Sequence, residues 1–412
     1  MKNASRNLAV ATYVAGVLLI HSLVAWNARD LIWKGYPDFT IYYTAGTMVR
    51  QGMGHSLYDD RLQLKIQKEF APQVATRLGA LPFNHPPFEA LLFLPLTCLP
   101  YPGAFLLWEL ANLAMLVCLP HLIRPYVPVL ALWPVALWTL AGLAFFPIFF
   151  ALLQGQDAIL LLFLFAASFV SLRKERFMSA GAWLACALFK FHLVLPFLLL
   201  LLIQEKTLQS RKRIVLGFSM VATLLGLLSI AVVGIRQVIS YPRYVLGLER
   251  TMAMGAIMPS DMPNLRGVLY LIASKASYLN LLVLFRSGVL FLRAAWSSRS
   301  LSFAPPDIAT DDLKFSMAVF ATVLVSYHAL GYDLCILALP LLLIAGQSQR
   351  IIRSGSWTRA AILAGTAALL FSPLLLVLLM RFNRLALLGW GVLACFLGLA
   401  GELRLRNQQL TA

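Results

Sequence analysis

Charged side chains are scarce in this 412-residue chain. Aspartate, glutamate, lysine and arginine make up 12% of it, whereas hydrophobic residues make up 60%, and the mean hydropathy is +0.79. A soluble domain could not hide so much apolar surface. The short alternating segments of a membrane β-barrel are also missing. Uncharged runs at residues 194–203, 214–233 and 360–380 instead approach the roughly 20 residues with which a helix crosses a bilayer. The composition therefore predicts an all-α polytopic membrane protein.

Other absences narrow the functional classes. The five cysteines lie in apolar stretches without paired spacing, which supports neither a disulfide framework nor a zinc site. No glycine-rich loop followed by Lys-Ser or Lys-Thr is present, so a nucleotide-sugar donor or ATP as an energy source has no support. Internal repeats, which are expected of many transporters, are not found. Acidic residues number only 17 against 34 basic ones, but the basic residues punctuate the ends of apolar runs, which indicates topology rather than nucleic-acid binding.

Basic residues also predict the orientation. Lys2 and Arg6 precede an apolar run at residues 8–26 that is too long for a cleaved signal, so it is interpreted as a signal anchor with a cytoplasmic N-terminus. The basic clusters at 173–176, 206–213, 293–299, 350–359 and 404–406 are placed on the same side. The remaining turns then face outward, including loops at 27–86 and 235–275. Residues 1–412 form one transmembrane domain of about 12 to 14 spanning or half-spanning helices, in which residues 87–153 make an even number of passes.

A lone lysine, Lys190, lies in the middle of the apolar segment 178–203, although both flanks of that segment are basic. Two half-length helices that meet near the outer side would explain this pattern. A lysine inside an apolar segment is a functional hypothesis by default and calls for an anionic partner. The alternative is a lysine that snorkels to the outer interface.

The first outer loop, residues 27–86, is far more polar than the rest of the chain. Between residues 60 and 80, the apolar residues Leu62, Ile66, Phe70, Val74 and Leu78 recur every four positions. This spacing predicts an amphipathic helix, which lies either on the outer membrane surface or packed on neighbouring loops. The sequence Phe83-Asn84-His85-Pro86-Pro87 then leads back into the membrane.

A short N-terminal anchor, an early aspartate in a large outer loop, surface helices and a Pro-Pro re-entry resemble the layout of C-type glycosyltransferases. More narrowly, the chain resembles family 87, the polyprenyl-phosphate-mannose-dependent mannosyltransferases. The stretches that carry the resemblance are DFTIYYTAGTMVRQGMGHSLYD (38–59), NHPPFEALLFLPL (84–96), GQDAILLL (155–162), ALFKFHLVLPFLLL (187–200) and SYHALGYDLCILALP (326–340). Two positions depart from the family pattern. Phe191 and His192 follow the lysine where a proline is usual, and the stretch Asn264-Leu265-Arg266 matches only loosely.

The resemblance implies roles for individual residues. Asp38 is the base that deprotonates the acceptor hydroxyl, and one carboxylate suffices for an inverting displacement. Lys190, Arg266 and Arg243 hold the donor phosphate. His328 is a further catalytic residue that contacts phosphate or acceptor, or carries a proton.

Contacts to sugar or acceptor are expected from a second group of residues: Tyr42, Tyr43, His85, Gln154, Gln156, Asp157, Asn264, Tyr332 and Asp333. Structural alternatives remain open for several positions. Asp38 and Asp333 could cap helices, the glutamines and Asp157 could satisfy a turn, and the tyrosines could belong to an aromatic belt. Arg243 could bind lipid headgroups nonspecifically.

A metal site is not expected. Asp38, His55, Asp59 and His85 fall within one loop, but no closely spaced pair of histidine and carboxylate on one helix face is apparent. The expectation is a metal-independent protein without a cofactor, although a metal ion is not excluded.

The function expected from the resemblance is transfer of a mannose-like hexose or a pentose from a polyprenyl-phosphate donor. The acceptor would be a lipid or cell-envelope glycan on the outer side of the cytoplasmic membrane. The expected partners are donor, acceptor and membrane lipids, without nucleic acid. A transporter or flippase of lipid-linked sugars shares the helices and the buried cation and is the alternative. An O-antigen ligase or polymerase typically has its large outer loop late in the chain, and the early loop argues against it.

Overall fold

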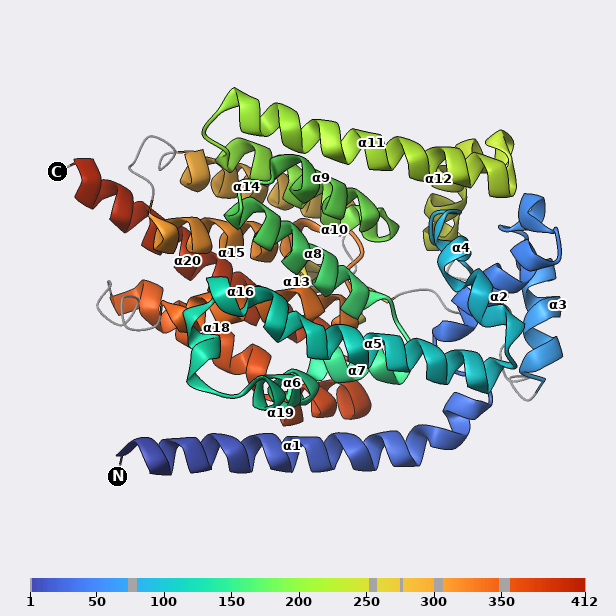
Figure 1. Cartoon of the computed structure of the whole chain (residues 1–412), viewed down its shortest axis with the longest axis horizontal. Coiled ribbons are helices and arrows are strands. Elements are labelled where there is room, and N and C mark those ends of the chain that lie inside the picture. Colours follow the sequence, from blue (N-terminus) through green and yellow to red (C-terminus); the bar gives the residue numbers. More distant parts are fainter. Residues whose placement is uncertain are drawn as a thin grey trace.

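The computed structural model describes residues 2–72, 80–251, 258–274, 277–299, 307–347 and 356–411. These ranges fold into helices without a strand, so the predicted all-α architecture is confirmed. Figure 1 shows most of the helices running side by side along the long axis. The two termini lie at one end of the molecule, whereas helices α2 (Phe39–Arg50), α3 (Asp60–Phe70) and α4 (Glu89–Phe93) gather at the other. These are called the terminal end and the loop end below.

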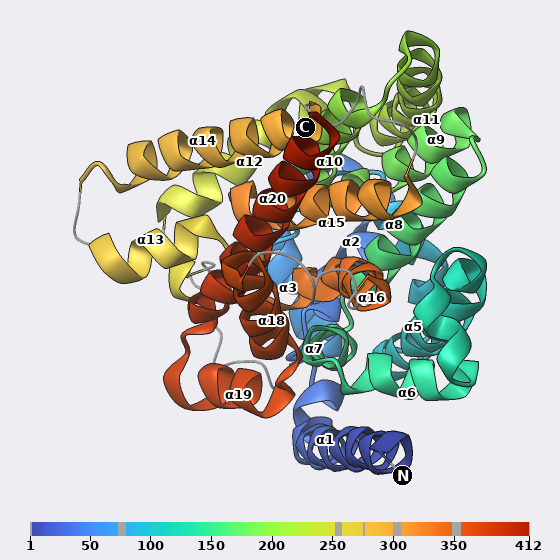
Figure 2. The same ribbon diagram turned by 90° about the vertical axis from the view of Figure 1, so that its left-hand side faces the viewer.

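Five segments of the described chain are long and apolar enough to cross a membrane. The first, Asn7–Trp33, belongs to α1 (Lys2–Trp33), and the last, Leu385–Gln408, includes most of α20 (Gly389–Thr411). Between them lie Tyr101–Tyr126, which contains α5 (Tyr101–Ile123), α11 (Leu208–Val233) and α14 (Leu279–Arg299). Figure 2 shows α1 along the outside of the bundle, where it contacts α6 (Val135–Ala144) and α7 (Phe146–Gln154).

Three further apolar stretches are bent pairs of helices. The breaks separate α6 from α7 by 74°, α9 (Phe177–Cys186) from the segment Leu188–Gln204 by 63°, and α18 (Ser356–Leu370) from the segment Ser372–Phe382 by 62°. Proline stands in the first turn of both α7 and α19 (Ser372–Val377), where its missing N–H costs no helical hydrogen bond. The second break lies at Ala187, and the 3-10 turn η5 (Leu188–Lys190) then leads into α10 (Phe191–Gln204), so Lys190 lies three residues after the break. The two predicted half-length helices are therefore confirmed.

The centre of the bundle is formed by α8 (Ala158–Arg173), α10, α15 (Ile308–Val325) and the pair η7 (Gly331–Leu337) and α16 (Ala338–Gly346). Most of α8 is buried, and its sequence is apolar on all sides, which is typical of a helix enclosed by other helices. Because α8 has 16 residues, it is about 24 Å long at 1.5 Å per residue. It joins the loop end at Asp157 to the terminal end at Arg173.

The predicted outer loops are largely helical. Residues 27–86 contain the end of α1, then α2, the short turn η1 (Gly54–Ser56) and α3. The second loop, 235–275, contains α12 (Ile235–Thr251), η6 (Pro259–Asp261) and α13 (Leu265–Ala273). Tyr241 and Tyr244 of α12 donate hydrogen bonds to the Asn84 carbonyl (3.1 Å) and to Asp60 (2.8 Å), so the two loops pack against each other.

The predicted amphipathic helix 60–80 is confirmed as α3 over residues 60–70, whereas its expected apolar positions Val74 and Leu78 lie outside the described residues. Ile66 of α3 is buried in a cluster with Leu57 and Phe83. Gln63 is also buried and accepts a hydrogen bond from the Phe83 N–H at 2.9 Å. This face of α3 therefore packs on its own chain, as in the second of the two alternatives.

Candidate functional site

The turn between α7 and α8 places three polar side chains at the loop end. Gly155 ends α7 in the left-handed conformation, with φ at 61°. A Cβ atom there would also come within 2.7 Å of the Cβ of Phe39, so the position favours glycine for both backbone and space. The tight turn directs Gln154 and Gln156 towards the start of α2 and leaves Asp157 at the start of α8.

Asp38 stands at the N-cap position of α2, but its carboxylate makes no capping hydrogen bond to that helix. This is unusual, because an aspartate at the start of a helix ordinarily accepts from the free backbone N–H groups. The Asp38 carboxylate instead accepts a hydrogen bond from Gln156 Nε2 at 2.7 Å, and its backbone N–H donates to Gln154 Oε1 at 3.2 Å. Tyr42, one turn further along α2, donates to Gln156 Oε1 at 2.7 Å. The capping alternative for Asp38 is therefore not what the structure shows.

Lys190 is buried at the end of η5, where α10 begins, and its ammonium group contacts two carboxylates. The distances from Lys190 Nζ are 3.1 Å to Asp157 Oδ1 and 3.3 Å to Asp333 Oδ1. The ring of Tyr332 lies 5.1 Å from the same nitrogen, within the range of a cation–π contact. The lysine does not snorkel. Its anionic partners come from the α7–α8 turn and from η7.

Asp333 has two tasks. One oxygen contacts Lys190, and the other accepts the Leu330 N–H at 2.8 Å at the start of η7. The predicted capping role is thus present together with the ion pair. This hydrogen bond from the backbone fixes the position of the Asp333 carboxylate, which compensates part of the positive charge of Lys190.

His85 and Glu89 complete a buried cluster with Asp157. His85 Nδ1 lies 2.7 Å from Glu89 Oε2 and 3.8 Å from Asp157 Oδ2. His85 precedes α4 in the Pro-Pro turn, Glu89 opens α4, and Tyr42 packs edge-on against the imidazole at 5.0 Å. The set His85, Glu89, Asp157, Lys190 and Asp333 is called the carboxylate cluster below.

Burial governs the protonation of this cluster. It lowers the pKa of His85 to about 4, an effect that the nearby Lys190 charge reinforces, so the imidazole is neutral at pH 7. Burial also raises the pKa of Glu89 and of Asp157 to about 7, while Lys190 acts in the opposite direction on both. The carboxylates are therefore only partly compensated by the charges around them.

Another group of predicted residues lies where α13 meets the segment between α15 and η7. Arg266 stacks its guanidinium 3.9 Å above the Tyr327 ring and donates to the Tyr327 carbonyl at 3.3 Å. Asn264 caps α13 through the Gly267 N–H and donates to the Ser326 carbonyl at 2.7 Å, so both ends of its amide serve the backbone. His328 lies beside His192, with ring centroids 6.1 Å apart.

Two further predicted residues belong to neither group by the contacts described. Tyr43 donates to the Leu99 carbonyl at 2.8 Å and packs against Phe70 and Tyr101, so its ring belongs to the α2–α5 packing. Arg243 is exposed on α12. Consecutive residues of a helix point about 100° apart, which is why Tyr42 and Tyr43 face different neighbours.

Glu89 and His192 were missing from the predicted site. The signal for Glu89 was its position four residues after His85, at the start of the re-entering helix. His192 follows Lys190 by two residues and faces His328. Neither spacing identifies a site residue in the sequence alone, because only the fold shows that both partners lie at the same end of the bundle.

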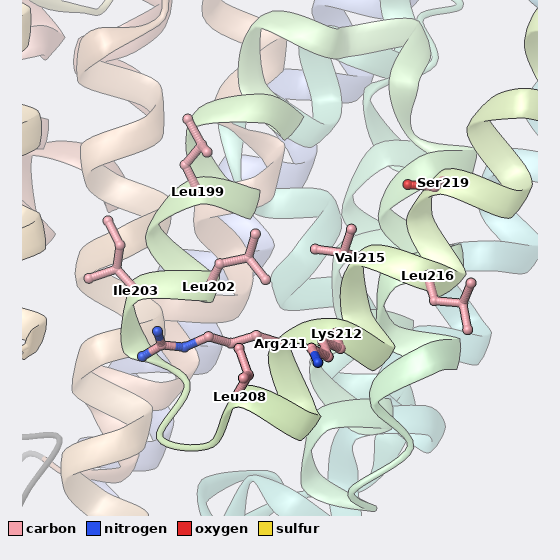
Figure 3. Close-up of a pocket in the computed structure, with 9 residues that line it drawn as sticks. All are labelled: Leu199, Leu202, Ile203, Leu208, Arg211, Lys212, Val215, Leu216 and Ser219. Atoms are coloured by element: carbon pink, nitrogen blue, oxygen red, sulfur yellow. The ribbon is translucent and has the colours of Figure 1, made fainter.

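The cavity drawn in Figure 3 lies away from the carboxylate cluster. It has a volume of about 650 Å³ and lies between the end of α10 and the start of α11, lined by aliphatic side chains together with Arg211, Lys212 and Ser219. Ile203 in its wall is 13 residues along the chain from Lys190, or roughly 20 Å at 1.5 Å per residue. The cavity therefore contributes nothing to the site around Asp38.

Comparison with known proteins gives one match. The family model of glycosyltransferase family 87 matches residues 83–326, which include His85, Gln156, Asp157, Lys190 and Arg266. The match begins after Asp38 and ends before His328, so it does not reach the two residues expected to be catalytic. No curated protein and no solved structure matches the chain. Because the match spans more than half of the sequence, the chain belongs to glycosyltransferase family 87, a family of membrane glycosyltransferases.

Proposed function

We propose that this membrane glycosyltransferase transfers a mannose-like hexose or a pentose from a polyprenyl-phosphate donor to a lipid or cell-envelope glycan. The reaction takes place on the outer side of the cytoplasmic membrane. The observation that carries the proposal is Asp38, whose carboxylate is withheld from helix capping and held by Gln156. An oriented carboxylate is what removal of a proton from an acceptor hydroxyl requires.

The position of the site along the bundle supports a lipid-borne donor. The α8 helix connects the carboxylate cluster to the basic terminal end over about 24 Å, whereas the hydrocarbon core of a bilayer is about 30 Å thick. With the basic clusters in the cytoplasm, the cluster lies slightly below the outer edge of the hydrocarbon core. A phosphate group attached to a membrane lipid can reach such a depth from the side.

The proposed reaction divides the work among three groups of side chains. Asp38 accepts the proton of the acceptor hydroxyl as the bond to the sugar forms. Arg266 and Lys190 stabilise the negative charge that grows on the departing lipid phosphate, and His328 assists as a contact or proton carrier. Lys190 already faces two carboxylates, so Arg266 carries the larger share of the phosphate contact. Arg243, exposed on α12, is a further candidate contact for the donor phosphate.

Asp38→Asn tests the assignment. In nanodiscs supplied with radiolabelled polyprenyl-phosphate sugars and native lipid extract, we expect label transfer to fall at least about 100-fold, because a positioned base typically contributes 10²–10⁴. Asp30→Asn is the matched control, since Asp30 is an exposed acid of α1, and it should transfer label like wild type. Equal activity of wild type and Asp38→Asn would refute the base role.

The alternative of a transporter gives a different result. If wild type transfers no label from mannose, arabinose or glucose donors, yet labelled lipid changes leaflet, the protein is a flippase. In that case the proposed function is wrong.

A further inference from the structure

We propose that His85, Glu89 and Asp157 form a binding site for one divalent transition-metal ion, Mn²⁺ or Zn²⁺. Each residue offers a ligand atom, and these atoms all lie within 4.8 Å of one another in the buried interior of the loop end. The proposal deepens the proposed function, on which the catalytic part of it rests. The occupancy of the site can be measured without activity.

The Glu89 carboxylate points to a missing ligand. Its side chain is 1% exposed, and neither of its oxygens accepts a hydrogen bond of acceptable geometry within the described chain. No lysine or arginine pairs with it among the described residues; its close polar neighbours are the His85 imidazole and the Asp157 carboxyl group. A buried carboxylate that is neither paired with a cation nor well hydrogen-bonded is strongly unfavourable. A cation bound between Glu89, His85 and Asp157 would remove this penalty.

The charge balance of the cluster leads to the same conclusion. Three buried carboxylates, those of Glu89, Asp157 and Asp333, face the single ammonium of Lys190. Lys190 reaches the Oδ1 atoms of Asp157 and Asp333 but is not paired with Glu89. The Oδ2 atom of Asp157 turns instead towards His85, at 3.8 Å. Asp157 can therefore bridge the lysine on one side and a metal ion on the other, and a divalent ion would offset the negative charge that Lys190 leaves uncompensated.

The donor set selects the class of metal. His85 offers one imidazole nitrogen beside the Glu89 and Asp157 carboxylates, and imidazole is the commonest metal ligand among side chains. One imidazole nitrogen with two carboxylates suits manganese or zinc better than calcium, which prefers oxygen ligands alone. Three protein ligands leave coordination positions open, as in catalytic metal sites. A lipid phosphate oxygen is the ligand that these positions would take, because the metal then shares the charge of the leaving group.

Metal binding to the purified protein is the direct test. The chain is purified in detergent with an affinity tag that binds no metal, stripped with a chelator and dialysed against Mn²⁺ or Zn²⁺. We expect about one bound ion per chain by elemental analysis, and an affinity at least about tenfold weaker in Glu89→Gln and Asp157→Asn, since each loses a ligand charge. Glu109→Gln, which changes a glutamate of α5 outside the cluster, is the matched control and should bind like wild type.

Thermal unfolding provides a second readout. A chelator should lower the unfolding midpoint of wild type and of Glu109→Gln, but leave Glu89→Gln unchanged, because a ligand that binds only the folded state stabilises it. The proposal is overturned if wild type retains no metal, or if Glu109→Gln loses metal as Glu89→Gln does. A protein that retains no metal and still transfers sugar would refute this site and leave the proposed function intact. A protein that binds metal but transfers no sugar would refute the proposed function and leave the metal site intact.

Discussion

The two ends of the bundle handle buried charge differently. At the terminal end, carboxylates contact cations: Arg173 pairs with Asp312, and Arg406 contacts both Glu402 at 3.1 Å and Asp307 at 3.6 Å. At the loop end, Asp157 and Asp333 share one lysine, and Glu89 has a neutral histidine beside it. The α8 helix connects the two ends, with Asp157 before its first residue and Arg173 as its last.

The contrast separates structural charges from functional ones. The ion pairs at the terminal end connect α8, α15 and α20. Because these charges are already compensated, a ligand would gain little binding energy from them. The excess negative charge at the loop end is costly in the empty protein, and it is tolerated where a ligand or a reaction uses it. Mutations at the two ends should therefore change different quantities, namely stability at the terminal end and chemistry at the loop end.

The largest expected effect on stability is at the terminal end. Arg173→Ala leaves Asp312 buried without its cation, because the Asp312 side chain is only 4% exposed, and this should lower the free energy of unfolding by about 3 kcal/mol. Chemical denaturation in detergent measures the loss. Arg29→Ala, which breaks an exposed pair with Asp30, should cost less than about 1 kcal/mol. The structural role assigned to the terminal end fails if the two variants are equally stable.

An intermediate effect is expected from the glutamine that holds Asp38. Gln156→Leu removes the group that donates a hydrogen bond to Asp38 and accepts one from Tyr42. Because the base is then misplaced, kcat should fall roughly 10- to 100-fold with little change in KM. Transfer kinetics at varied donor concentration separate the two parameters. Gln204→Leu is the comparison, because Gln204 hydrogen-bonds Ser298 and the Lys314 carbonyl near the other end of the bundle. It should reduce stability with kcat unchanged; the same loss of kcat in both variants would contradict the assignment.

The smallest expected effect is a change in the free energy of unfolding that has opposite signs at the two ends. In the presence of a chelator, Glu89→Gln removes a like charge beside Asp157 and should raise the free energy of unfolding by about 1 kcal/mol. Glu402→Gln removes the partner of Arg406 and should lower it by a similar amount. Unfolding midpoints of the two glutamate-to-glutamine variants test this directly, and shifts of the same sign would remove the contrast between the ends.

The sequence by itself determined the all-helical membrane architecture, the break close to Lys190 and the early polar segment with Asp38. These features follow from hydropathy and from the high cost of burying a charge in a bilayer. Both can be evaluated from a short stretch of the sequence. The family resemblance added the roles of Asp38, Lys190 and Arg266, of which the family match covers only the last two positions.

Tertiary structure alone decided which charges meet. Gln156 lies 118 residues from the aspartate it holds, and Lys190 lies between two carboxylates that come from different helical pairs. The grouping of Glu89 with His85 and Asp157 likewise depends on where α4 re-enters the bundle. The rotation and depth of each helix are set by packing against its neighbours, and the hydropathy of a segment carries almost no information about them. The sequence therefore shows that polar residues lie at the loop end, and the packing of the helices decides which of them are paired.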